Sequence, residues 1–189
     1  MGSTEQRRAA QSAAPSKVLG NALRELDRFL SVLIDEVAAA TGIDDAALAR
    51  LRTRRNTANK LRWLLGKLGQ ASPDHLRLRA LGRARDCFFH CGGWVRRADH
   101  RAGASMTTGW WARSPTGAPA LQTFPIGGRL RIDSIDIDDI CRFYDRIAGD
   151  LVASSRAFRA RRHVSPRNSV AFSRNKAHNS VAIVACDGL

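Results

Sequence analysis

Acidic residues are scarce in this sequence, and long hydrophobic runs are missing. Its 189 residues include 17 Asp and Glu against 31 Lys and Arg, which gives a formal net charge of +14 at pH 7. This excess is larger than solubility requires and has the sign that attracts phosphate backbones. Residues 1–16 contain no apolar stretch of signal-peptide or membrane-spanning length, so we expect a cytoplasmic protein without a membrane partner. Nucleic acid is therefore the first class of partner to consider.

Cysteine is also infrequent, and four residues in a chain of this size do not resemble a disulfide framework. They are Cys87, Cys91, Cys141 and Cys186. Cys87 and Cys91 are four residues apart, and with His90 and His100 they suggest a zinc site as one alternative. Their spacing is not that of an established zinc finger, and Cys91 also falls on an apolar stripe. We therefore expect free thiols, with Cys87 and Cys91 packed in the core, and neither a metal nor another cofactor.

Apolar residues recur at steps of three and four, which predicts amphipathic helices. The first helix is expected over residues 17–40. A second, capped by Asp44, is expected to continue to Gly69, and a third begins at Ser72 and Pro73 and ends before Gly92. Asp136 is expected to cap the last main helix.

The segment between the third and last helices has no helical period. Residues 92–128 are rich in glycine and predict a long loop, and residues 129–133 predict a short strand. The predicted fold is all-α, a small bundle of four to five helices with a long Gly-rich loop or short hairpin before the last main helix. We expect residues 1–16 to be a flexible N-terminus, 17–158 the helical domain, and 159–189 a basic, loosely ordered tail.

One stretch of the second predicted helix contains no acid at all, from Ala46 to Pro73. It carries seven basic residues, namely Arg50, Arg52, Arg54, Arg55, Lys60, Arg62 and Lys67. Without acids to form i,i+4 pairs, like charges repel along a helix. Either a solvated surface or a surface that faces phosphate groups would explain this composition.

The end of the third predicted helix reads Arg85-Asp86-Cys87-Phe88-Phe89-His90, followed by Gly92 and Gly93. On an ideal helix Arg85 and His90 are about 140° apart, so we expect them not to share a face within one chain. Asp86 and His90 are four residues apart and do share one. Asp86 is therefore expected to hydrogen-bond the imidazole and fix its tautomer. A surface ion pair of Arg85 and a favourable contact of His90 with the helix dipole are the plainer explanations.

This stretch resembles the signature of the HEPN superfamily, in which an arginine and a polar residue are followed, four to six residues on, by a histidine. The resemblance covers about residues 17–155, although Cys91 stands where an Asn is common. It implies an all-α homodimer, and for many members a metal-independent endoribonuclease that acts as a toxin or in defence. Arg85 and His90 would be catalytic and Asp86 the polar helper. An antitoxin or inhibitor protein is a further candidate partner.

These residue types suit RNA cleavage, because the ribose 2′-OH is a built-in nucleophile. His90 can transfer protons near neutral pH, and Arg85 can hold two phosphate oxygens. A two-fold dimer would bring two copies of the motif together. The expected product ends are a 2′,3′-cyclic phosphate and a 5′-OH.

Further basic residues are candidates for holding RNA, namely Arg54, Arg55, Arg96 and Arg97. Trp94, Trp110 and Trp111 could stack on unpaired bases, but at least one of the three is expected to pack the loop onto the bundle. A non-catalytic HEPN-like module that binds RNA or a protein is the alternative function. A DNA-binding protein is less favoured, because no recognition-helix signature is present.

Overall fold

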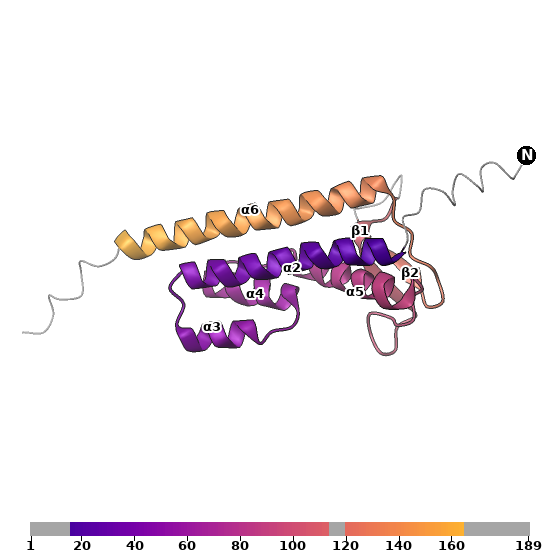
Figure 1. The fold of residues 1–189 in the computed structure, drawn as a ribbon, viewed down its shortest axis with the longest axis horizontal. Helices are drawn as coiled ribbons and strands as arrows, with labels where there is room; N and C mark the ends of the chain where they lie inside the picture. The colour runs from indigo at the N-terminus through magenta and orange to yellow at the C-terminus, as the bar shows by residue number, and fades with distance from the viewer. Residues whose placement is uncertain (1–15, 114–119, 165–189) are drawn as a thin grey trace, which may run out of the picture.

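The computed structural model describes residues 16–113 and 120–164, which form a mostly helical fold (Figure 1). The helices are α2 (Ser16–Ala40), α3 (Asp45–Arg52), α4 (Thr57–Lys67), α5 (His75–Cys91) and α6 (Ser134–Val164). Strands β1 (Ser105–Trp111) and β2 (Leu121–Pro125) lie between α5 and α6. The predicted helical fold class is thus confirmed in its main feature, but the fold is not strictly all-α. Residues 1–15 of the N-terminus predicted to be flexible, and most of the predicted tail, lie outside the described residues, while Ser16 is the first residue of α2.

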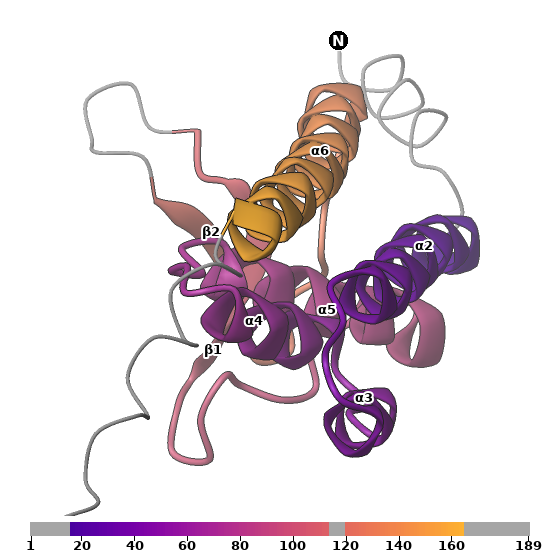
Figure 2. The ribbon, with the colours of Figure 1, turned by 90° about the vertical axis from the view of Figure 1, so that its left-hand side faces the viewer.

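Helix α2 occupies a central position and contacts α3, α4, α5 and α6. Viewed along the bundle, α2, α6 and the α4–α5 pair surround a common centre, and α3 lies outside them (Figure 2). Leu30 and Ile34 of α2, Leu81 and Phe88 of α5, and Ile140 of α6 are buried there. Full burial of each such side chain contributes roughly 1.5–3 kcal/mol to the stability of the fold. The apolar faces of the three helices therefore stabilise one another.

The single helix predicted from Asp44 to Gly69 is wrong, because the chain breaks it into α3 and α4. Asp44 does cap α3, where its side chain accepts a hydrogen bond from the Ala47 N–H. Asn56 then caps α4 by accepting from the Asn59 N–H at 3.2 Å. A side chain that satisfies free N–H groups favours a helix start over a helix interior. The apolar period continues across the break and therefore concealed it.

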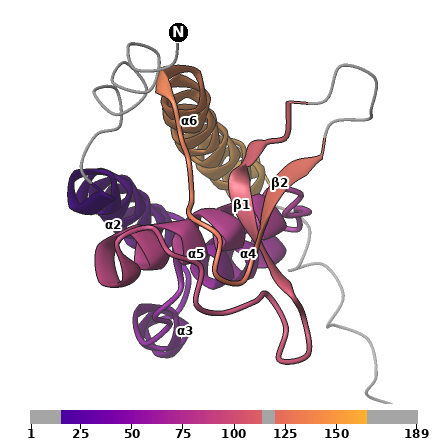
Figure 3. The same cartoon turned by 90° about the vertical axis from the view of Figure 1, so that its right-hand side faces the viewer.

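The predicted strand at residues 129–133 is also wrong. Within the described residues, the strands are β1 and β2, which pair antiparallel with Ser105 opposite Pro125 and Thr107 opposite Thr123. Arg129 forms only an isolated bridge to Trp94. The hairpin packs against α5 on the side away from α2 (Figure 3). Trp110 is fully buried, and its Nε1–H donates to Gln122 Oε1 at 2.9 Å.

Two helix starts differ from their predicted positions. Helix α5 begins at His75, after Asp74 and not at the Ser72–Pro73 pair. In α6 the cap is Asp133, because Asp133 Oδ1 accepts from the Asp136 N–H and Asp136 Oδ2 accepts from the Asp133 N–H. This is a reciprocal capping pair, and Asp136 is its second member.

The last helix is longer than predicted from the sequence. Helix α6 continues to Val164, so residues 159–164, predicted to belong to the tail, are helical. Along the part of the chain given by residues 16–113 and 120–164, none of the helices combines the length and the hydrophobicity that crossing a bilayer requires.

Helices α2 and α5 approach closely at Gly20. A Cβ built at Gly20 would lie 2.9 Å from the backbone nitrogen of Phe89, whereas one built at Gly149 of α6 meets nothing within 4 Å. The absent side chain at Gly20 thus lets the first turns of α2 contact the last turn of α5. This contact determines which α2 residues lie beside His90.

Alanine at these two glycines is expected to change stability in opposite directions. Gly20→Ala should lower the free energy of unfolding by about 1–3 kcal/mol, because the helices must separate. Gly149→Ala should raise it by roughly 0.5–1 kcal/mol, because an exposed helix interior gains propensity. Urea unfolding followed by circular dichroism measures both. Equal shifts in the two variants would contradict the close helix contact.

Candidate active site

The C-terminal end of α5 carries a cavity of about 320 Å³. It is lined by Arg24, Arg85, Asp86, Phe89 and His90. Asp86 and His90 are exposed, Arg85 is half-buried, and the His90 ring lies edge-on to the Phe89 ring with centroids 4.8 Å apart. The predicted catalytic residues therefore line one solvent-accessible cavity.

Arg85 is held by two carboxylates, one from each of the helices that form the cavity. Its Nη1 donates to Asp27 Oδ2 of α2 at 2.5 Å, and its Nε donates to Asp86 Oδ1 at 2.9 Å. Burial raises the pKa of Asp27, although the charge of Arg85 acts in the opposite direction. Burial also raises the pKa of the nearby Tyr144 hydroxyl, which stays protonated, and the charge of Asp27 adds to this effect. The guanidinium is thus fixed against the buried side of α2.

Two expectations about the motif are wrong in detail. Arg85 and His90 line the same cavity, although an ideal helix separates their directions. That projection considers only the start of each side chain, whereas the long Arg85 side chain extends to Asp27 on the neighbouring helix. Asp86 Oδ1 accepts from Arg85, and no hydrogen bond between Asp86 and His90 is found among the described residues. Asp86 therefore positions the guanidinium, and not the imidazole as predicted.

Arg24 and Asp27 belong to this site but were missed in the sequence analysis. Arg24 is exposed, its guanidinium lies 5.6 Å from the centre of the Phe89 ring, and it makes no ion pair within the described residues. Arg24 reaches the cavity because α2 contacts α5 at Gly20. No pattern in the sequence near Arg24 predicts this contact. Asp27 could have been recognised from the sequence, because it lies between Leu23 and Leu30 on the buried stripe of α2. A carboxylate in such a position requires a hydrogen-bonding or charged partner.

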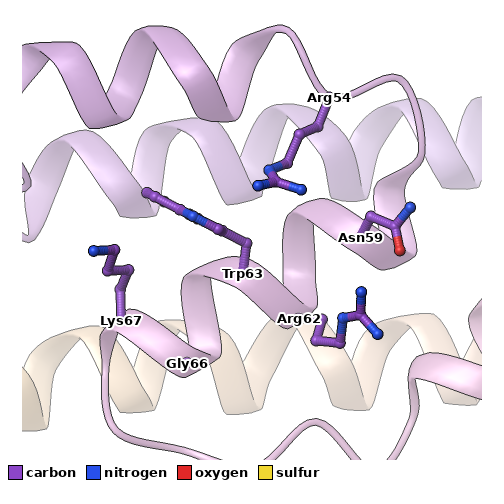
Figure 4. Close-up of a pocket in the computed structure, with 6 residues that line it drawn as sticks. All are labelled: Arg54, Asn59, Arg62, Trp63, Gly66 and Lys67. Atoms are coloured by element: carbon purple, nitrogen blue, oxygen red, sulfur yellow. The ribbon is translucent and has the colours of Figure 1, made fainter.

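A second cavity, of about 430 Å³, lies on the connection between α3 and α4 (Figure 4). It is lined by Arg54, Asn59, Arg62, Trp63, Gly66 and Lys67. Arg54, predicted to hold RNA, therefore lines a cavity, while Arg55, Arg96 and Arg97 are exposed and line neither cavity. Lys60, which belongs to the acid-free segment from Ala46 to Pro73, does not contribute to its basic surface. Its side chain is only 8% exposed and donates to Asp35 Oδ2 at 2.7 Å, so it fastens α4 to α2.

The tryptophans of the loop region divide into two groups. Trp110 is buried between Phe88 and Phe124, which confirms the expectation that at least one of them packs the loop onto the bundle. Trp94 is 49% exposed and Trp111 40% exposed. A guanidinium lies near each of these two rings, since Arg129 lies 5.9 Å from the Trp94 centroid and Arg77 lies 5.0 Å from that of Trp111.

The zinc alternative finds no support in the geometry of the described residues. Among residues 16–113 and 120–164, no three His, Cys, Asp or Glu side chains gather as metal ligands do. Cys87, Cys91 and Cys141 are free thiols, and Cys186 lies outside the described residues. Burial raises the pKa of the Cys87 thiol to about 11, so it remains protonated near neutral pH.

His75, the first residue of α5, predicts a pH dependence of stability. It is buried, and its Nε2 lies 3.1 Å from Asn59 Oδ1. Burial, then the charges of Arg62 and Arg79, lower its pKa from the ordinary 6.5. The unfolded chain therefore binds more protons than the folded protein once the pH falls below 6.5, so the folded protein loses stability there.

This expectation is checked by thermal unfolding between pH 8 and pH 5. His75→Gln should flatten the fall in Tm on the acid side, because the amide keeps a donor toward Asn59 but does not titrate. His100→Gln, at an exposed histidine, is the matched control and should leave the profile unchanged. The assignment to His75 fails if the two variants behave alike.

No protein-family model matches this sequence, and no curated protein or solved structure does. The function is therefore inferred from the chemistry of the two cavities. One cavity combines an exposed imidazole with two guanidinium groups. The other combines three cationic side chains with an indole ring and lacks an acid.

Proposed function

We propose that this protein is a metal-independent endoribonuclease of HEPN type that cleaves single-stranded RNA. The observation that carries the proposal is the cavity at the end of α5, where His90 is exposed beside Arg24 and Arg85. An exposed imidazole can transfer protons to and from a substrate, and guanidinium groups stabilise the charge that develops on a phosphate. We propose that it acts in the cytoplasm as a toxin or defence protein, restrained by an antitoxin or inhibitor protein.

In the proposed reaction, the 2′-oxygen attacks the adjacent phosphorus and the bond to the 5′-oxygen breaks. His90 accepts the proton of the 2′-OH, and the departing 5′-oxygen receives a proton in turn. The product ends are a 2′,3′-cyclic phosphate and a 5′-OH. Arg85 is already paired with Asp27 and Asp86, so Arg24 is the guanidinium that is free to grip the phosphate oxygens. Arg85 lines the cavity beside it, with its charge offset by these two carboxylates.

A second copy of the chain would supply a second imidazole as the acid for the leaving group. A dimer is not needed to bring Arg85 and His90 together, although their separation on an ideal helix suggests such a need, because both residues line one cavity within a single chain. The need for two proton-transfer groups remains, and the HEPN resemblance implies a dimer as well. Val18, Phe29 and Val32 are exposed apolar residues of α2, the helix that carries Arg24. Light scattering after size-exclusion chromatography tests this part, and a monomer at micromolar concentration would refute it.

The function is tested by incubating the protein with labelled single-stranded RNA in EDTA. We expect cleavage that persists in chelator, leaves cyclic phosphate ends, and disappears in His90→Ala. Cleavage that EDTA abolishes, or that His90→Ala leaves unchanged, would overturn the proposal.

A non-catalytic module that binds RNA is the second candidate. The pairing of Arg85 with two carboxylates favours it, because a neutralised guanidinium holds phosphate less strongly. Binding of RNA without any cleavage in the same experiment would select this alternative.

A further inference from the structure

We infer that the cavity on α4 and the connection before it is a binding site for single-stranded RNA, separate from the cavity that contains His90. The inference deepens the proposed function, since it assigns where the substrate is held outside the cleavage site. The Trp63 pocket is this cavity, which Arg54 and Trp63 line. Four of its residues, Asn59, Arg62, Trp63 and Gly66, lie on one face of α4, since they follow one another at helical spacing.

The Trp63 pocket offers positive charge that is not neutralised. Arg54, Arg62 and Lys67 are exposed, and none of them makes an ion pair within the described residues. No acid occurs in the sequence from residue 46 to residue 73. This differs from the cavity at His90, where Asp27 and Asp86 offset Arg85. Of the two cavities, the Trp63 pocket is therefore the stronger attractor for a phosphate backbone.

The pocket also offers a surface on which a base can stack. The Trp63 indole extends between Arg54 and Lys67, and Arg54 reaches it from the chain after α3 (Figure 4). Lys67 Nζ lies 5.6 Å from the centre of the Trp63 ring. Trp63 is half-buried and packs against the core with part of its side chain. A Cβ built at Gly66, which also lines the pocket, meets nothing within 4 Å. Cationic groups around a partly exposed aromatic ring are what single-strand binders use, because every unpaired base has a face that can stack.

The arrangement of charge also explains why Lys60 is absent from the pocket. Its ammonium group donates instead to Ser31 and Asp35 of α2. Helix α4, which lines most of the pocket, is thus fastened to α2. A rigid support for the pocket lowers the entropic cost of binding.

The test measures binding of a fluorescent single-stranded 2′-O-methyl RNA, which has no free 2′-OH and cannot be cleaved. Trp63→Leu should weaken binding about 5- to 150-fold, and Trp63→Tyr should restore most of the affinity. An RNA duplex of the same sequence should bind equally to wild type and Trp63→Leu, because its bases are not free to stack. Unchanged single-strand affinity in Trp63→Leu, or an equal loss with the duplex, would overturn the inference. Thermal unfolding confirms that both variants fold.

A charge control separates a pocket from a general electrostatic attraction. Arg54→Ala with Lys67→Ala should lower the slope of log affinity against log salt by about 1.4, corresponding to two lost phosphate contacts on a single strand. Arg142→Ala with Arg156→Ala removes the same charge from exposed positions of α6 and should change the slope little. Equal changes in the two double variants would refute the pocket.

The binding measurement also separates this inference from the proposed function. His90→Ala should bind the uncleavable RNA as the wild type does. Loss of cleavage in His90→Ala with unaltered binding in the Trp63 and Arg54 variants would retain the nuclease and reject the pocket. Loss of binding in those variants without any cleavage by the wild type would do the reverse.

Discussion

Replacing His90 with alanine is expected to lower the rate of RNA cleavage in EDTA by about 10²- to 10⁴-fold, the usual contribution of a general acid or base. His90 is the only histidine that lines the cavity at the end of α5, so no other imidazole of the described chain substitutes for it there. The rate is measured with excess protein over a labelled oligonucleotide, so that product release does not mask the chemical step. RNA affinity should not change, because the imidazole contributes little to holding the strand.

The matched control is His100→Ala, at an exposed histidine outside the cavity. It should cleave at the wild-type rate. If both histidine variants lose activity equally, or neither does, His90 is not the proton-transfer group. Arg24→Ala and Arg85→Ala extend the test to the guanidinium groups. Arg85→Ala should also lower thermal stability, because it leaves the half-buried carboxylate of Asp27 without its ion-pair partner, whereas Arg24→Ala should leave thermal stability unchanged.

Trp110→Ala is expected to lower the free energy of unfolding by about 3–5 kcal/mol, which is a large part of the stability of a domain of this size. The ring is fully buried between Phe88 of α5 and Phe124 of β2, and its removal leaves a cavity and an unpaired Gln122 amide. Urea unfolding gives the free energy directly. The hairpin should then detach from α5.

Its neighbour Trp111 provides the control for this measurement. Trp111 is 40% exposed and contacts the Arg77 guanidinium, so Trp111→Ala should cost about 1 kcal/mol or less. A comparable loss in both variants would show that burial of the Trp110 ring is not what holds the hairpin to the bundle.

The helices could be predicted from the sequence because each buries one stripe of apolar residues. The division into α3 and α4 could not, because the stripe continues across residues 53–56 and only the capping by Asn56 marks the break. A short hairpin before the last main helix was one of the two predicted alternatives, but its strands could not be placed, for a related reason. They contain Thr, Gly and Gln at inward and outward positions without clear alternation, and what stabilises them is the packing of Trp110 against α5, which is a tertiary contact.

The candidate site could likewise be predicted only in part from the sequence. Arg85, Asp86 and His90 are close in sequence and were found by their spacing, although the partners assigned to Asp86 were wrong. Arg24 and Asp27 come from a helix about 60 residues earlier, and only the approach at Gly20 brings them to the motif. Lys60 looked like part of a basic face because its partners, Ser31 and Asp35, are also distant in sequence. Patterns along a chain reveal which face of a helix is apolar, but not which neighbour it meets.

The crossing of α2 and α5 at Gly20 has one further consequence. Every side chain that lines the His90 cavity belongs to one of these two helices, so the chain after Gly93 contributes no wall to it. Lengthening or trimming the turns around the hairpin would therefore leave the spacing of imidazole and guanidinium groups intact, while a change of one methyl group at the crossing would alter all of it.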